Sequence, residues 1–128
     1  MTVLVAYNPS PHGEAAVRTA IAEASRRGVP LHVVHLARSE DPEGGDPLDG
    51  LLAAAGDGVE VRPVTRRSPG TEPADVILDT AEADGATLVV LGSRKRSSAG
   101  TFLIGTTTQR VLLDSPVPVL VVKDAYDG

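Results

Sequence analysis

Apolar runs and amphipathic runs alternate along the chain. One stretch, residues 59–64, alternates apolar and polar positions, and Pro63 within it indicates a sheet edge or a strand end. Continuous apolar stretches are typical of strands that are covered on both faces, and they occur at residues 3–7, 31–36, 87–92 and 117–122. The pattern therefore predicts five strands.

The segments between these strands carry apolar residues at helical spacing. Ser10 and Pro11 form an N-cap followed by proline at the first helical position, and Gly28 ends that helix. A second helix is expected to begin at Pro73 and to end at Gly85. Shorter helices are expected at residues 48–55 and 106–113.

Strands separated by helices predict an α/β fold, namely a single-domain open, doubly wound parallel five-stranded sheet of the Rossmann-like type. Such sheets bind ligands beyond the carboxyl ends of the strands, where the strand order reverses. The first strand ends near Asn8 and the fourth near Gly92, so the loop after Gly92 lies where this fold class binds its ligands. Residues 38–50 are acidic and rich in Gly and Pro, and we expect a flexible surface loop there.

Composition and charge narrow the classes of function. With 128 residues, 41% hydrophobic and 23% charged, the chain has the make-up of one ordinary globular domain. Aromatic residues are 2% and the net charge is −5, which argues against nucleic-acid binding through stacking or through phosphate contacts. The lack of cysteine excludes disulfides, thiolate metal sites and cysteine nucleophiles. No apolar run suits a membrane helix and residues 1–8 resemble a strand rather than a signal peptide, so the expected location is cytoplasmic.

The passage from residue 91 to residue 110 carries the candidate chemistry. Gly92 permits a turn and the close approach of a ligand to the backbone. Gly105 and the threonines at 106–108 would present N–H groups and hydroxyls at a helix N-terminus, which favours anions. Arg94, Lys95 and Arg96 add positive charge nearby. By spacing alone, both a phosphate-binding loop and a solvated connection remain open, because the standard G-x-x-x-x-G-K-[ST] and G-x-G-x-x-G motifs are absent.

With its surroundings, this loop resembles the universal stress protein (UspA) family over nearly the full chain. The family's loop reads G-x-x-G, nine residues, then Gly followed by Ser or Thr. Here Gly92-Ser93-Arg94-Lys95, nine residues, then Gly105-Thr106 has that spacing. The stretches "VLVAYNPSPHGEAAVRTA", "LHVVHL", "PADVILDTAEADGATLVVLGSR" and "VLLDSPVPVLVV" match as well. The resemblance implies one universal-stress-protein domain of UspA type over residues 1–128.

What the resemblance implies for function is a cytoplasmic stress-response module that binds ATP, with Mg²⁺ or Mn²⁺ as the accompanying cation. Family members that bind nucleotide hold adenine and ribose at the ends of the first two strands, and hold the phosphates at the glycine loop. A homodimer through the last strand, Val117 to Val122, is also expected, because Pro118 places that apolar strand at a sheet edge. Carried over to this sequence, the nucleotide-binding residues are Ala6, Tyr7, Asn8, Leu36, Gly92, Ser93, Arg94, Lys95, Gly105, Thr106 and Thr107.

Two residues depart from the family pattern. Lys95 replaces the second glycine of the motif, and a left-handed backbone there would cost about 1–2 kcal/mol, or roughly tenfold in affinity. Asn8 stands where Asp is usual, so a hydrogen-bonding carbonyl remains but the charge is lost. These departures leave open the alternative of a dimeric regulatory or interaction protein that binds no nucleotide. A hydrolase or adenylyl-transfer enzyme has little residue support, so we expect at most slow ATP hydrolysis and no catalytic residues.

The three histidines do not predict a metal site. His32 and His35 are three residues apart on one strand and therefore point to opposite faces of the sheet. His35 is expected to be a hydrogen-bonded histidine near the pocket, and His12 an exposed residue on the first helical turn.

Overall fold

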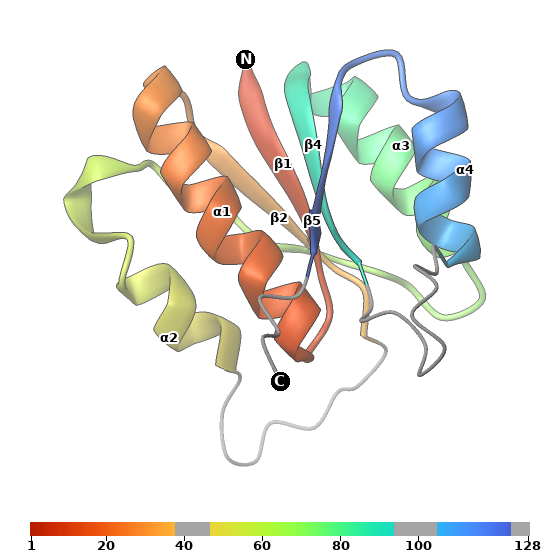
Figure 1. The fold of residues 1–128 in the computed structure, drawn as a ribbon, viewed down its shortest axis with the longest axis horizontal. Coiled ribbons are helices and arrows are strands. Elements are labelled where there is room, and N and C mark those ends of the chain that lie inside the picture. Colours follow the sequence, from red (N-terminus) through yellow and green to blue (C-terminus); the bar gives the residue numbers. More distant parts are fainter. Residues whose placement is uncertain (38–46, 94–104, 124–128) are drawn as a thin grey trace.

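The computed structural model describes residues 1–37, 47–93 and 105–123. Five parallel strands form one sheet in the order β3-β2-β1-β4-β5 (Figure 1). The predicted open, doubly wound, parallel α/β sheet is therefore confirmed, and the strand order reverses at β1, which pairs with β2 on one side and with β4 on the other. The strands are β1 (Thr2–Tyr7), β2 (Leu31–His35), β3 (Thr65–Arg66), β4 (Ala86–Ser93) and β5 (Val119–Lys123).

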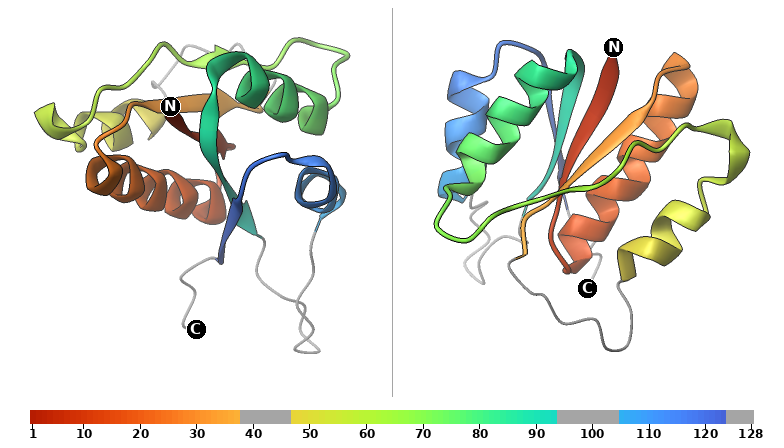
Figure 2. Two further views of the ribbon diagram at one scale, coloured as in Figure 1. Left: turned by 90° about the horizontal axis from the view of Figure 1, so that it is seen from above. Right: turned by 180° about the vertical axis from the view of Figure 1, so that it is seen from behind.

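Helices cover both faces of the sheet (Figure 2). On one face, α1 (Pro11–Arg27) packs on the strands and α2 (Pro47–Ala53) lies beside it, followed by a 3-10 turn, η1 (Gly56–Gly58). On the other face lie α3 (Pro73–Asp84) and α4 (Thr106–Asp114). The two buried clusters consist almost wholly of Val, Leu, Ile and Ala, as the low aromatic content requires.

The longer helices begin and end where the sequence predicts. The Ser10 side chain accepts a hydrogen bond of 3.0 Å from the backbone N–H of Gly13, and Pro11 opens α1. Gly28 and Gly85 end α1 and α3 with φ of 68° and 65°, a left-handed conformation that L side chains rarely adopt. The turns that deliver the chain into β2 and β4 are therefore set locally by the sequence.

The strand at 59–64 is not where the sequence places it. Only one isolated parallel bridge, between Val61 and Leu31, forms in that range, and the paired strand is β3 at Thr65–Arg66. Pro63 has no N–H to donate, so the ladder with β2 is interrupted there and resumes two residues later. The expectation that this strand lies at a sheet edge is confirmed.

β5 forms the other edge of the sheet, as Pro118 predicts. Among the described residues, no helix combines the length and the apolar character needed to span a membrane. Residues 38–46 of the predicted acidic loop, and the cations Arg94, Lys95 and Arg96, lie outside the described residues.

Candidate functional site

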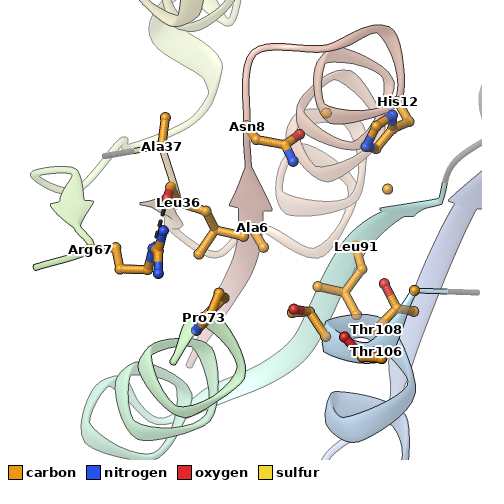
Figure 3. A pocket seen from close by; sticks show the side chains of 14 residues that line it. Ala6, Asn8, His12, Leu36, Ala37, Arg67, Pro73, Leu91, Thr106 and Thr108 are labelled. Carbon is orange, nitrogen blue, oxygen red and sulfur yellow. Dashed lines mark hydrogen bonds between the residues drawn. The ribbon is translucent and has the colours of Figure 1, made fainter. Parts of the chain in front are cut away.

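A cavity of about 440 Å³ opens at the carboxyl ends of β1, β2 and β4, beside the start of α4 (Figure 3). This volume lies within the range of small-molecule sites, about 300–1,000 Å³. The position is the one that parallel sheets use for ligands, where the strand order reverses. The lining residues are Ala6, Asn8, His12, Gly13, Leu36, Ala37, Arg67, Pro73, Leu91, Gly92, Gly105, Thr106, Thr107 and Thr108.

Most of the residues that sequence reasoning assigned to a nucleotide meet at this cavity. Those that line it are Ala6, Asn8, Leu36, Gly92, Gly105, Thr106 and Thr107. Tyr7 and Ser93 do not line it; both are buried, and the Tyr7 ring contacts that of His35 edge-on, with centroids 5.0 Å apart. Because side chains alternate along a strand, Tyr7 packs in the cluster under α1 while Ala6 faces the cavity. Arg94 and Lys95 lie outside the described residues.

The first turn of α1 orients Asn8. The Ser10 hydroxyl donates to Asn8 Oδ1 at 2.8 Å while it accepts the N–H of Gly13. His12 Nε2 lies 3.3 Å from Ser10 Oγ. With Oδ1 held by Ser10, the amide nitrogen of Asn8 is left on the cavity side (Figure 3). An aspartate here would offer only acceptors, whereas this asparagine offers a donor.

Two glycines, Gly13 and Gly92, allow backbone segments to approach closely at the floor of the cavity. A Cβ on Gly13 would lie 2.0 Å from the carbonyl oxygen of Asn8, and one on Gly92 would lie 2.2 Å from that of His12. The end of β1, the first turn of α1 and the end of β4 therefore meet backbone to backbone. Gly92 is required by packing, in addition to any ligand it contacts. Around Gly105, by contrast, a Cβ would meet no heavy atom within 4 Å among the described residues.

The N-terminus of α4 faces the cavity. Gly105 is the N-cap residue, with φ −67° and ψ 165°, and no side chain caps the helix. The first N–H groups of a helix have no partner within the helix and carry partial positive charge. Together with the hydroxyls of Thr106, Thr107 and Thr108, they form a wall suited to an anion.

Several residues that line the cavity were not among those predicted from the sequence. His12, expected to be exposed, is half-buried at the cavity rim, because the Ser10 cap folds the first turn of α1 back over Asn8. Arg67 contributes a positive charge to the lining, and no carboxylate occurs among the described lining residues. The capping pattern at Ser10 was a usable signal for His12. For Arg67 the sequence held none, since it follows a strand whose position Pro63 obscures. The other additions are Gly13, Ala37, Pro73, Leu91 and Thr108.

The histidines on β2 occupy opposite faces, as predicted. His35 is buried under α1, where its Nδ1 accepts the N–H of Ala37 at 3.2 Å. His32 lies on the α3 face and pairs with Asp84. In the ranges that the structure describes, no three His, Cys, Asp or Glu side chains are grouped so as to hold a metal ion.

Comparison with known proteins identifies the family. Residues 1–123 match the model of the universal stress protein family. A universal stress protein from Mycolicibacterium smegmatis is 33% identical over 130 residues, covering 94% of this chain and 96% of its own length. A universal stress protein structure from Archaeoglobus fulgidus is 29% identical, with a TM-score of 0.76 and coverage of 96% of this chain and 98% of that one. Another from the same organism, in complex with dAMP, is 27% identical with a TM-score of 0.71 and the same coverage. The chain therefore belongs to the universal stress protein family.

Proposed function

We propose that this protein is a stress-response module that binds an adenine nucleotide, ATP, in the cavity at the ends of β1, β2 and β4. The observation that carries the proposal is the uncapped N-terminus of α4 facing a cavity of about 440 Å³ at the strand-order reversal. The dAMP complex of a universal stress protein that is 27% identical supports an adenine nucleotide as the ligand. The module acts by binding, with at most slow hydrolysis.

The two sides of the cavity suit the two ends of a nucleotide. Ala6, Leu36 and Pro73 offer apolar surface for a base and a sugar (Figure 3). On the other side, Gly105 and Thr106 offer backbone N–H groups and a hydroxyl for phosphate oxygens. Asn8 lies between these two walls and presents its amide. Such a lining binds and orients a nucleoside phosphate.

A divalent cation has no protein ligand of its usual kind among the described lining residues. Mg²⁺ is generally held by one or two carboxylates together with substrate phosphates, and the described lining has no carboxylate. The phosphate charge is instead opposed by the partial positive charge at the N-terminus of α4.

The test is a calorimetric titration of the protein with ATP, repeated with Gly105→Val and Arg94→Ala. Gly105→Val should weaken binding by about tenfold or more, since a branched side chain keeps phosphate from the backbone N–H groups. Its φ of −67° suits any L residue, and among the described residues no heavy atom lies within 4 Å of a Cβ placed there. Arg94→Ala removes one positive charge, which we expect to be screened by solvent and worth about 0–1 kcal/mol, and should weaken binding less. Equal losses in the two variants would contradict the assignment of the phosphates to the α4 backbone.

We further propose that the protein works as a homodimer through β5. The strand is an apolar sheet edge, and Leu113 of the preceding helix is 76% exposed. An unpaired edge of this kind readily pairs with another chain. Light scattering at micromolar concentration should show a dimer that Val119→Lys or Val121→Lys converts to a monomer. A monomeric wild type that neither substitution alters would contradict the proposal.

A further inference from the structure

Arg67 is fixed against the cavity wall by the backbone of two segments. Its own N–H donates to the carbonyl of His35 at 3.0 Å, which continues the pairing of β3 with β2. In its side chain, Nε donates to the carbonyl of Leu36 at 2.9 Å (Figure 3), and Nη1 donates to that of Thr71 at 2.8 Å. The guanidinium is thus held between the end of β2 and the connection into α3.

This arrangement leaves donors for a ligand. A guanidinium carries five N–H donors and no acceptor. Within the described ranges, the bonds to Leu36 and Thr71 are those that the Arg67 side chain makes, so the N–H groups of Nη2 remain for a bound molecule. Because the side chain is already held in one conformation, little rotamer freedom is lost when a ligand binds.

Arg67 lies at the end of the cavity away from α4. Figure 3 places Arg67 with Leu36 and Ala37 on one side and Thr106 with Thr108 on the other. If phosphates occupy the α4 N-terminus, the part of the ligand that reaches Arg67 is the nucleoside. The lining on that side is otherwise apolar, so a fixed donor there selects for a matching acceptor.

We propose that Arg67 is a specificity-determining residue, which donates to an acceptor atom of the nucleoside and so selects nucleoside phosphates over simple polyphosphates. The inference rests on the proposed function and adds a residue and a selectivity to it. Inorganic polyphosphate has no nucleoside, so when its phosphates lie at the α4 N-terminus it places no acceptor atom beside Arg67. A site that hydrogen-bonds a specific group of its ligand discriminates against ligands that lack it.

The experiment titrates wild type, Arg67→Ala and Arg66→Ala with ATP and with inorganic tripolyphosphate. Arg66 is the matched control, because it is the neighbouring exposed arginine on β3 and its loss changes the net charge equally. Arg67→Ala should lower ATP affinity by about tenfold and leave tripolyphosphate affinity within about twofold. Arg66→Ala should change both by less than about twofold. Arg67→Lys should not restore ATP affinity, since an ammonium lacks the planar fork that spans two carbonyls.

The titrations distinguish a failure of this inference from a failure of the proposed function. Unchanged ATP affinity in Arg67→Ala, or equal losses for ATP and tripolyphosphate, overturns the inference and leaves the proposed function standing. Retained tripolyphosphate affinity in Arg67→Ala shows that the cavity has not collapsed, which separates a lost contact from a lost fold. A wild type without saturable ATP binding overturns the proposed function and this inference together.

Discussion

Two groups of polar side chains lie on the sheet, one at each end of its strands. At the carboxyl ends, Asn8, Arg67 and the first turn of α4 line the cavity. Toward the amino ends, His32 lies between Asp84 and Thr65: its Nδ1 is 2.9 Å from Asp84 Oδ2 and its Nε2 is 2.8 Å from Thr65 Oγ1. Because a carboxylate only accepts, Nδ1–H donates to Asp84, and Nε2 forms the second hydrogen bond with the Thr65 hydroxyl.

The difference lies in where the hydrogen-bonding groups point. In the His32 cluster each polar side chain is satisfied by its neighbours, and the chain of bonds ties β2, β3 and the end of α3 together. At the cavity, Ser10 fixes Asn8 and two carbonyls fix Arg67, and within the described residues the Asn8 amide nitrogen and Arg67 Nη2 remain as donors. A cluster that satisfies itself stabilises the fold, whereas fixed donors that face a cavity are suited to a ligand.

The largest effect is expected when a side chain is added at the cavity floor. Gly92→Val should destabilise the protein by about 3 kcal/mol or more, because its Cβ would lie 2.2 Å from the His12 carbonyl oxygen in a buried strand. Urea unfolding measures the change, with Gly105→Ala as the control in open space. A Gly92→Val variant as stable as wild type would mean that β4 and α1 do not approach as closely as described.

Removing the hydrogen bonds of His32 and Asp84 tests whether this cluster stabilises the fold without contributing to the cavity. His32→Ala and Asp84→Ala should each cost about 1–3 kcal/mol of stability, since each leaves a half-buried partner unsatisfied. The double variant should cost less than the sum of the two, because the pair is lost only once. ATP affinity should stay within about twofold of wild type, because none of His32, Thr65 and Asp84 is among the described residues that line the cavity. A large loss of ATP binding in these otherwise folded variants would refute the separation of the two regions.

The smallest effect is expected at Lys95, in the loop that joins β4 to α4. Lys95→Gly should change ATP affinity by about tenfold or less, since relief of the backbone and loss of the ammonium act in opposite directions. Titration at two salt concentrations checks the charge contribution, which salt should screen. A loss far greater than tenfold would make Lys95 itself the principal phosphate ligand.

The sequence predicts the helices and strands that position the site better than it predicts which side chains line the cavity. Ser10, Gly28 and Gly85 determine helix ends through local geometry, so the elements that carry Asn8 and Gly92 to the cavity were predictable. Pro63 indicated an edge, but the register after it depends on pairing with β2, and the paired strand therefore begins at Thr65, directly after the predicted range of 59–64.

Arg67 shows why the rest could not be predicted. Its position at the cavity depends on the carbonyl of Leu36, which lies 31 residues away at the end of β2, as well as on that of Thr71 nearby. No local pattern in the sequence encodes the contact with Leu36. The same holds for the pairing of His32 with Asp84, which lie 52 residues apart. Polar residues at strand ends look alike in the sequence. Only the tertiary structure shows which of them line the cavity and which form hydrogen bonds that hold the strands and helices together.

The most direct test of the central claim compares ATP with adenosine in titrations of the wild-type protein. If the α4 N-terminus holds phosphate, ATP should bind saturably at submillimolar to millimolar concentration, and about tenfold or more tightly than adenosine. Both titrations use the same folded sample, so no variant has to be interpreted. Equal affinities for ATP and adenosine, or no saturable ATP binding at millimolar concentration, would contradict the account.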